Sequence, residues 1–280
     1  MKVIVTGASG FVGHRVVNEL LRRGIKTCAV SRHPLEFSDS IVVDNYMDTP
    51  RGDILIHLAD NSNRAQVNER GVSHAVEARE LAKRLISNGY QRIVFASSVV
   101  VYGDKCSKLH KPIDAVLAND IYSQSKLERE ELFVNYNGVI ARLSNLYGAG
   151  MSPENVISKI IKQVPRGGGI KVWNDKPIRD FLWIDDAVDA LVEMALGKSK
   201  GIFNVASGRA VSVKELVKTV SMASGVDKPS TLHITKPCDE YSAIMLDISD
   251  TVNSFGWIPK ITLEDGIRSL LDNKNKMRVK

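Results

Sequence analysis

A glycine-rich turn within the first thirteen residues constrains the fold more than any other feature of this 280-residue chain. An apolar run at 3–5 is long enough for a buried strand, and Gly7, Gly10 and Gly13 follow it directly. A helical pattern comes next, with apolar residues at 16, 17, 20 and 21 and a capping glycine at 24. Bare glycines let backbone N–H groups approach a diphosphate, and a helix N-terminus favours negative charge. Strand, turn and helix in this order predict a dinucleotide-binding site.

The rest of the first half alternates strands and helices, which predicts a doubly wound parallel sheet of the Rossmann type. We expect further strands at 27–31, 41–43, 54–59, 92–97 and 138–143, and helices at 72–86 and 122–133. The segment 45–53 is too short for a crossover helix, so we expect a loop there. The fold class is therefore α/β.

Composition limits the kinds of partner. No apolar stretch reaches transmembrane length, and the chain opens on a strand rather than a signal peptide, so we expect a cytoplasmic protein without a membrane partner. Cys28, Cys106 and Cys238 are too far apart for a zinc site or a disulfide framework, and we expect no metal. The net charge of +6 is mild. It favours a phosphorylated small substrate over a nucleic acid.

The end of the second strand predicts which dinucleotide binds. An acidic residue at this position accepts hydrogen bonds from the ribose 2′-hydroxyl of NAD and repels a 2′-phosphate. This strand ends instead in Ser31 and Arg32. An arginine can bind phosphate through two parallel hydrogen bonds, and a serine adds a hydroxyl. We therefore expect NADP in preference to NAD.

The candidate catalytic groups follow later in the chain. Tyr122 and Lys126 are four residues apart and share one face of a predicted helix. A neighbouring ammonium favours the phenolate form of a tyrosine and so brings the phenol into range for proton transfer. Ser98 ends the strand that precedes this helix, at the sheet edge where active groups of such folds gather. We expect Ser98 to bond a substrate oxygen with which Tyr122 exchanges a proton.

With these residues in place, the chain resembles the extended short-chain dehydrogenases/reductases, in the nucleotide-sugar epimerase, dehydratase and ketoreductase group. The similarity runs nearly from end to end. It rests on TGASGFVG (6–13), IHLA (56–59), SSVVVYG (97–103), YSQSK (122–126), RLSNLYG (142–148), RDFLWIDD (179–186), FNVASG (203–208) and FGWIP (255–259).

The resemblance implies an architecture and a set of residue roles. The dinucleotide-binding domain would comprise 1–148 and 179–206. A smaller, discontinuous α/β substrate domain would comprise 149–178 and 207–280, and the protein would form a homodimer. Ser98, Tyr122 and Lys126 match the catalytic trio. Cofactor-binding candidates are Gly7, Ser9, Gly10, Phe11, Val12, Gly13, Ser31, Arg32, Asp44, Asn45, Leu58, Ala59, Tyr122 and Lys126. Substrate-binding candidates are Asp60, Ser98, Asn145, Arg179 and Lys236.

Departures from the family pattern narrow the chemistry. The 4,6-dehydratases of the family carry an Asp-Glu pair after the catalytic serine, where this chain has Val99 and Val100, so dehydration is disfavoured. A cysteine used in 3,5-epimerisation is absent at Val99, and Cys106 is too distant to replace it. Asp60 stands where the family has an alanine, and Lys236 where a diphosphate-binding arginine is expected.

Other polar and aromatic residues have structural interpretations. His57 interrupts an apolar strand and is expected to be a hydrogen-bonded core residue. Trp173 and Trp183 are expected to serve packing rather than substrate stacking. Asp185 and Asp186 are expected to begin a helix, where carboxylates complement the helix dipole.

Three functions remain open. The favoured one is NADPH-dependent reduction of a nucleotide-linked 4-keto-(deoxy)sugar. The alternative is an NAD(P)-dependent nucleotide-sugar 4-epimerase, which oxidises and re-reduces one carbon with its cofactor retained. A third is a non-catalytic NADP-binding sensor or RNA-binding scaffold, which would need none of Ser98, Tyr122 and Lys126. Neither the sugar nor the nucleotide base follows from the sequence.

Overall fold

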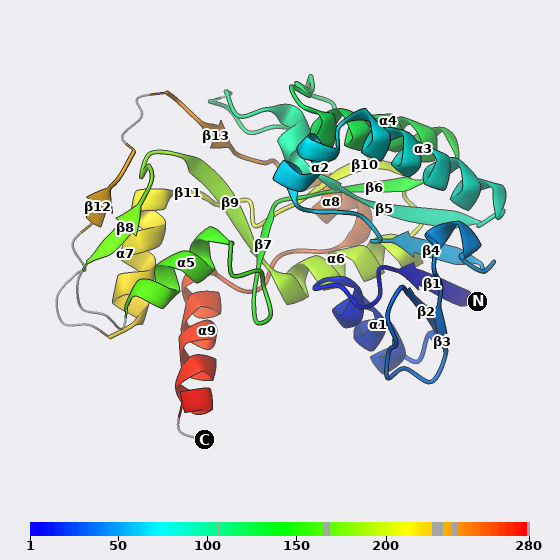
Figure 1. The fold of residues 1–280 in the computed structure, drawn as a ribbon, viewed down its shortest axis with the longest axis horizontal. Helices are drawn as coiled ribbons and strands as arrows, with labels where there is room; N and C mark the ends of the chain where they lie inside the picture. The colour runs from blue at the N-terminus through cyan, green and yellow to red at the C-terminus, as the bar shows by residue number, and fades with distance from the viewer. Residues whose placement is uncertain (106, 165–168, 226–231, 237–239, 279–280) are drawn as a thin grey trace.

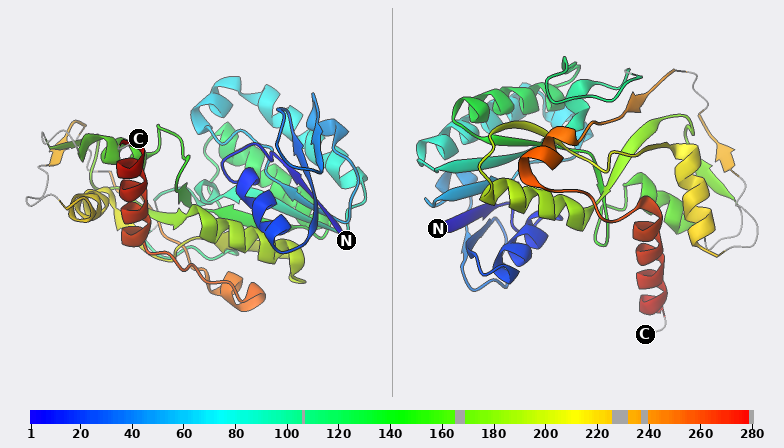
Figure 2. Two further views of the ribbon diagram at one scale, coloured as in Figure 1. Left: turned by 90° about the horizontal axis from the view of Figure 1, so that it is seen from below. Right: turned by 180° about the vertical axis from the view of Figure 1, so that it is seen from behind.

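The computed structural model describes residues 1–105, 107–164, 169–225, 232–236 and 240–278 (Figure 1). Cys106 and Cys238 lie outside the described residues. A wide sheet with helices on both faces makes up the larger part, and a smaller part holds two short sheets and three helices (Figures 1 and 2). Within the described residues, no helix is both long and apolar enough to cross a membrane.

The large sheet confirms the predicted Rossmann-like class. Its strands all pair in parallel. Their spatial order is β10 (Gly201–Val205), β6 (Val139–Leu143), β5 (Arg92–Ser98), β4 (Ile54–His57), β1 (Lys2–Thr6), β2 (Lys26–Ser31) and β3 (Ser40–Val42). The order reverses at β1, because β2 lies on one side of it and β4 on the other. The carboxyl ends of β1 and β4 therefore border the crevice in which such folds bind ligands.

Helices cover the two faces of this sheet (Figure 1). α1 (Gly13–Arg22) and α6 (Ile184–Leu196) pack together on one face. α3 (Val72–Ser87) and α4 (Ile121–Asn135) pack together on the other, beside α2 (Arg64–Arg70). The segment 45–53 holds only one short 3₁₀ turn, η1 (Tyr46–Asp48), so the expectation of a loop without a crossover helix is confirmed. Helix α2 was not predicted.

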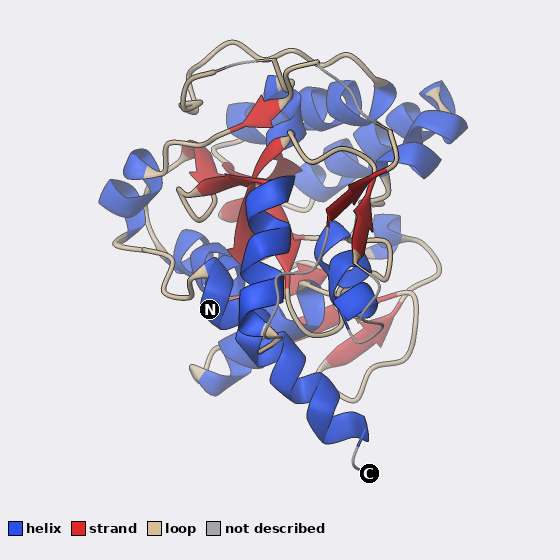
Figure 3. Ribbon diagram, turned by 90° about the vertical axis from the view of Figure 1, so that its left-hand side faces the viewer, coloured by secondary structure: helices blue, strands red, loops and turns tan. Residues whose placement is uncertain are grey.

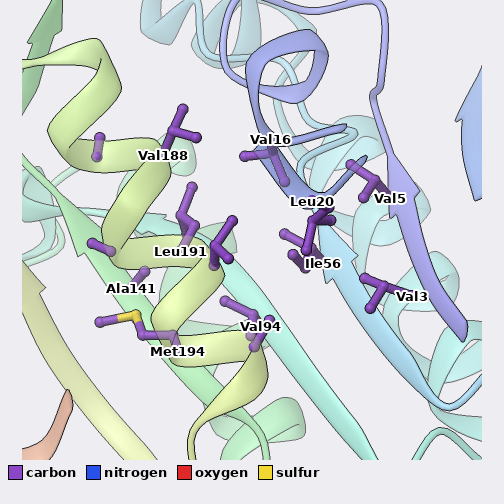
Figure 4. Close-up of a cluster of buried hydrophobic side chains, with 14 of the residues drawn as sticks. Val3, Val5, Val16, Leu20, Ile56, Val94, Ala141, Val188, Leu191 and Met194 are labelled. Atoms are coloured by element: carbon purple, nitrogen blue, oxygen red, sulfur yellow. The ribbon is translucent and has the colours of Figure 1, made fainter. Parts of the chain in front are cut away.

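Apolar alternation along the strands builds the core beneath α1 and α6. Val3, Val5 and Ile56 point from the sheet toward Leu20 of α1 and Leu191 of α6 (Figure 4), and all five side chains are fully buried. This core holds the glycine turn that follows β1 against the rest of the sheet.

The smaller part combines segments that are far apart in the sequence. One sheet contains β7 (Asn145–Tyr147), β9 (Ile178–Trp183), β11 (Ala210–Ser212) and β13 (Ala243–Ile244). A two-stranded sheet pairs β8 (Ile170–Val172) with β12 (Leu232–Ile234). α5 (Val156–Gln163), α7 (Val213–Ala223) and α9 (Leu263–Arg278) complete it, and the C-terminal end of α9 projects from the molecule (Figure 3). The larger sheet of this part pairs strands from both predicted domains.

The last segment of the chain crosses back to the large sheet before α9. α8 (Ser249–Phe255) packs against β10 and α6 (Figure 2). Nε1 of Trp257 donates to the carbonyl oxygen of Asp186 at 3.0 Å. The two parts are therefore joined by several crossings of the chain.

Three structural interpretations from the sequence can be checked. His57 is 1% exposed, and its Nδ1 lies 2.8 Å from Oγ1 of Thr6, which confirms a hydrogen-bonded core histidine. Asp185 and Asp186 lie in the first turn of α6, as expected. The expectation for Trp173 is wrong: its side chain is 73% exposed on the smaller part, just after the end of β8. Its ring lies beside the Lys236 ammonium. Trp183 does pack, edge-on to Tyr147.

Candidate active site

A large pocket opens at the carboxyl ends of β1, β2 and β4. Its volume is about 970 Å³. The cofactor-binding candidates on its wall are Gly7, Ser9, Gly10, Arg32, Asp44, Asn45, Leu58 and Ala59. Asp60, expected to meet substrate, also lies on this wall. These residues, which were predicted from the sequence, line one cavity. Their contact with a cofactor stays a prediction.

The glycines of the first turn are required by close backbone approach. Gly7 has a φ of +72°, and a Cβ placed on it would lie 2.7 Å from the carbonyl carbon of Leu58. A Cβ on Gly13 would lie 2.1 Å from the carbonyl oxygen of Gly7. No side chain fits at either position, so the turn presents bare backbone to the pocket. Such a cradle at a helix N-terminus fits the diphosphate of a dinucleotide.

The two candidates at the end of β2 have different surroundings. Arg32 lies on the pocket wall, and its guanidinium carbon is 5.8 Å from the ring centre of Tyr46. Ser31 is fully buried, and its hydroxyl donates to Oγ of Ser9 at 2.9 Å. Ser31 therefore ties the glycine turn to β2, and Arg32 is the residue of this pair that reaches the pocket. Phe11, Val12 and Gly13 form the end of the turn and the start of α1.

A second pocket of about 140 Å³ lies where η2 (Val99–Tyr102) follows β5. Its wall brings together three substrate-binding candidates, Ser98, Asn145 and Arg179. Lys236 is not brought to them. It lies on the smaller part, where its ammonium is 5.1 Å from the ring centre of Trp173.

Tyr122 and Lys126 are held by the start of α4. Asp120 caps this helix: its carboxylate accepts from the backbone N–H of Ser123 at 2.9 Å, and the Ser123 hydroxyl faces the backbone N–H of Asp120 in return. The backbone N–H of Tyr122 donates to Oδ1 of Asn68 on α2 at 2.9 Å. Tyr122 is 8% exposed and Lys126 is 5% exposed, so both candidate catalytic side chains are shielded from solvent.

The Lys126 ammonium bridges β5 and the wall of the larger pocket. Its Nζ donates to the carbonyl oxygen of Ala96, on the strand that ends at Ser98, at 2.7 Å. The same Nζ lies 2.8 Å from Oδ2 of Asp60, on the wall of the larger pocket. The ring centre of Tyr122 is 5.8 Å from this ammonium.

The two adjacent serines at the end of β5 have different surroundings. Ser97 is 3% exposed and donates to Oε1 of Glu130, which also pairs with the buried Arg142 at 2.7 Å. Ser98 lies on the wall of the smaller pocket. Its hydroxyl accepts only a long hydrogen bond, 3.4 Å from the backbone N–H of Val100, among the contacts of the described residues. Ser98 is thus the serine able to turn its hydroxyl toward a substrate.

Arg179 supplies the positive charge of the smaller pocket. Its Nη2 donates to the Ser242 hydroxyl at 2.6 Å and lies 3.4 Å from the Asp104 carboxylate. Burial lowers the pKa of this guanidinium, and the carboxylate of Asp104 opposes that effect. Asn145 donates through Nδ2 to the carbonyl oxygen of Asp180 at 2.9 Å. Both side chains are therefore oriented by β9 and by the segment before β13.

Sequence reasoning missed several residues of the site. Arg64, Asp104 and Asn119 lie on the wall of the smaller pocket. Arg64 belongs to the unpredicted helix α2, and the other two lie in irregular chain between η2 and α4, where no periodicity marks them. Arg129 also escaped notice, although its position one turn after Lys126 on the same predicted helix face was a usable signal.

This fold and this site define a class of enzyme. A parallel Rossmann-like sheet carries the glycine turn, and Ser98 at the end of β5 lies on the wall of the smaller pocket. The start of α4 carries Tyr122 and Lys126, which lie on the wall of neither pocket, and Lys126 bonds to the strand that ends at Ser98. These features identify an NAD(P)-dependent oxidoreductase or epimerase of the extended short-chain dehydrogenase/reductase type. The chain belongs to the NAD dependent epimerase/dehydratase family, whose model matches residues 3–206.

Individual relatives agree with this assignment. The chain is 26% identical to the dTDP-4-dehydro-6-deoxyglucose reductase of Escherichia coli, over 96% of each protein. The UDP-glucose 4-epimerase of Thermotoga maritima, solved with UDP-glucose, superimposes with a TM-score of 0.86 at 21% identity, covering 99% of this chain and 100% of the other. MoeE5 in complex with UDP-glucose and NAD gives a TM-score of 0.86 at 25% identity, with the same coverage.

Proposed function

We propose that this protein reduces the 4-keto group of a nucleotide-linked deoxysugar with NADPH. The observation that carries the proposal is the apolar pair Val99 and Val100 beside Ser98, in a site with the tyrosine and lysine needed for a carbonyl reduction. The similarity to a dTDP-4-dehydro-6-deoxyglucose reductase over nearly the whole chain supports the same reaction class.

The roles of the residues follow from their positions. The glycine turn and Arg32 would hold a nicotinamide dinucleotide, which would supply the hydride. The Ser98 hydroxyl donates a hydrogen bond to the keto oxygen and orients it. Tyr122 gives its phenolic proton to that oxygen as negative charge develops there, and Lys126 stabilises the phenolate that remains. One hydride and one proton convert the ketone to an alcohol.

The wall of the smaller pocket limits the other reactions that this site could perform. Val99 and Val100 cannot carry a proton, so neither can assist elimination of water. Asp104 is the carboxylate on this wall, among the described residues, and it is engaged by Ser242 at 2.6 Å and by Arg179. Arg179 and Asn145 would bind the substrate diphosphate, and Arg64 on the same pocket wall would add a further cation.

The preference for NADP rests on Arg32. Its guanidinium is on the wall of the larger pocket, stacked near Tyr46, and no acidic residue ends β2. Cells keep the NADP pool reduced, so an NADPH-binding enzyme of this family is suited to net reduction. Because the structure of MoeE5 contains NAD, titration of both cofactors is the test of this preference.

The decisive experiment mixes the purified protein with NADPH and a panel of nucleotide-linked 4-keto-6-deoxysugars carrying dTDP, GDP, UDP or CDP. We expect loss of the reduced-nicotinamide absorbance in proportion to product, with one base strongly preferred. A thermal-shift screen of nucleotide sugars with NADP present selects that base first, since a ligand that binds only the folded state raises the unfolding midpoint.

The second candidate is a nucleotide-sugar 4-epimerase, and the structural similarity to a UDP-glucose 4-epimerase favours it. An epimerase holds its cofactor through oxidation, rotation of the sugar and re-reduction. Interconversion of gluco- and galacto-configured UDP-sugars without net consumption of NADPH would decide for this candidate and against the reductase.

A further inference from the structure

A buried carboxylate and a buried guanidinium lie beside Lys126. Asp60 follows β4, and Arg129 lies one turn after Lys126 on α4; their side chains are 11% and 3% exposed. A single oxygen, Oδ2 of Asp60, accepts from Nη1 of Arg129 at 2.8 Å and lies 2.8 Å from Nζ of Lys126. One carboxylate therefore holds two cations in a place where an unpaired charge is costly.

The hydrogen bonds of the Lys126 ammonium show what Asp60 controls. An ammonium has three N–H groups to donate. One points to Asp60, and another to the carbonyl oxygen of Ala96 at 2.7 Å. A single N–H remains for Tyr122 or for a bound ligand. Asp60 thus determines where the ammonium lies and how much of its hydrogen-bonding capacity stays available.

Arg129 is anchored independently of Lys126. Its Nε donates to the carbonyl oxygen of Ser125 at 3.0 Å. The ring of Phe95, on β5, faces both cations, with the guanidinium carbon 5.2 Å and the ammonium nitrogen 5.0 Å from its centre. Asp60 and Arg129 are therefore fixed between rigid elements, rather than forming a mobile surface pair.

Two histidines and three ion pairs lie on the elements around this cluster. Burial lowers the pKa of both His57 and His74, so both rings are uncharged near neutral pH. Nε2 of His74 is 3.8 Å from Oδ1 of Asp60. The ion pairs join Arg70 to Glu77, Arg64 to Asp120, and Arg142 to Glu130. The wall of the larger pocket also carries Arg32, Asp44 and Glu80.

Asp60 remains ionised in this setting. Burial alone would raise the pKa of its carboxyl, but the charges of Lys126 and Arg129 outweigh that effect and hold the pKa below its ordinary range. Two cations and one carboxylate leave one net positive charge on this cluster, and its Lys126 ammonium is 5.8 Å from the ring centre of Tyr122.

We propose that Asp60 is a positioning residue for Lys126 and that, together with Arg129, it sets the net positive charge that faces the Tyr122 phenol. The inference rests on the proposed function for the roles of Tyr122 and Lys126, and it does not depend on which sugar is reduced. Removing Asp60 leaves two positive charges and favours the phenolate more strongly. Removing Arg129 leaves none and favours the neutral phenol.

The test is a tyrosinate titration of the ligand-free protein, followed by ultraviolet absorbance. Wild type, Asp60→Asn, Arg129→Met and the double variant are each compared with the same protein carrying Tyr122→Phe, which isolates one tyrosine out of seven. We expect the Tyr122 midpoint to fall by about one pH unit in Asp60→Asn and to rise by about one unit in Arg129→Met. The double variant should return close to wild type.

Controls separate charge from general damage. Arg23→Met removes a cation just after the end of α1, which lies on the face of the sheet opposite α4 (Figure 1), and should leave the Tyr122 midpoint unchanged. Circular dichroism at each pH checks that the variants are folded. If Asp60→Asn does not fold, Arg129→Met alone still tests the sign, since an unchanged or lowered midpoint contradicts the proposal.

The two proposals fail separately. Equal Tyr122 midpoints in all four proteins would make the Asp60–Arg129 pair purely structural and overturn this inference, whatever the enzyme reduces. The expected opposite shifts, in a protein that consumes NADPH with none of the keto-sugars, would leave this inference standing and overturn the proposed function.

Discussion

At the scale of single residues, the side chains available to bind a ligand are those whose polar atoms are not already hydrogen-bonded inside the protein. The hydroxyls of Ser31 and Ser97 are bonded inside the protein, to Ser9 and Glu130, whereas their neighbours Arg32 and Ser98 reach the pockets. The sequence analysis chose Ser98 over Ser97 but gave Ser31 and Arg32 equal standing, because adjacent residues at a strand end can point either way. Burial decides between them.

Tyr122→Phe tests the proton donor. The substitution keeps the ring and removes only the hydroxyl, so we expect kcat to fall by about a hundredfold or more while NADPH affinity is retained. Steady-state kinetics and a cofactor titration measure the two effects. Tyr136→Phe, at the other end of α4, is the matched control and should behave as wild type. A loss of NADPH affinity larger than the loss of rate would contradict the assigned role.

Arg32→Ala tests the cofactor preference. We expect NADPH affinity to fall at least tenfold, about 1.4 kcal/mol, with a smaller change for NADH, because only NADPH carries the 2′-phosphate. Calorimetric titration of both cofactors gives the ratio. Arg51→Ala removes an exposed arginine elsewhere and should change neither affinity. Equal losses for the two cofactors would show that Arg32 does not select between them.

At the scale of helices and strands, the site depends on the hydrogen bond and the ion pair that hold α4 against β5 and β6. The Glu130 carboxylate on α4 accepts a hydrogen bond from the Ser97 hydroxyl on β5 and forms an ion pair with Arg142 on β6. The side chains of Glu130 and Arg142 are each 3% exposed. The sequence predicted these elements well, since their apolar periodicity is strong. It could not predict α2, which has only one buried residue, nor the buried ion pairs, whose members lie far apart in the chain.

Breaking the Glu130–Arg142 ion pair should destabilise the fold. Glu130→Gln leaves the Arg142 charge buried without its partner, so we expect a loss of about 3–5 kcal/mol in the free energy of unfolding. Urea denaturation measures it. The double variant Glu130→Leu/Arg142→Met should lose less than either single change, because no buried charge is left unpaired. Glu264→Gln, in an exposed pair on α9, is the control and should have little effect.

At the scale of the whole molecule, folding is linked to pH through His57. Burial lowers the pKa of this ring to about 3, against 6.5 for an exposed histidine. The unfolded chain therefore binds a proton that the folded chain does not between those values. This contribution to stability is complete above pH 6.5 and is lost as the pH falls toward 3.

The measurement compares urea denaturation at pH 7 and pH 5. We expect wild type to lose about 2 kcal/mol more than His57→Gln over this interval, because glutamine can bond Thr6 without titrating. His14→Gln, which changes an exposed histidine, should follow wild type. Identical pH dependence in wild type and His57→Gln would show that the ring is protonated in the folded state.

The sequence predicted the overall architecture of the molecule better than the pairing of its short strands and the contacts of single side chains. Parallel β1, β2, β4, β5 and β6 followed from apolar runs separated by helices and glycine turns. The pairing of β9 with both β7 and β13 did not, because short strands in a discontinuous part carry little periodicity. Lys236 was placed by analogy with a site residue, and the structure puts it beside Trp173 instead.

The connectivity of the large sheet has a consequence for synthesis on the ribosome. The strand β6 ends at Leu143, but its outer neighbour β10 is not made until residues 201–205. β9 likewise waits for β13 at 243–244. A nascent chain stopped between these points presents unpaired backbone on β6, which can recruit a strand from another molecule. Translation must therefore pass beyond residue 205 before the outer side of β6 is paired.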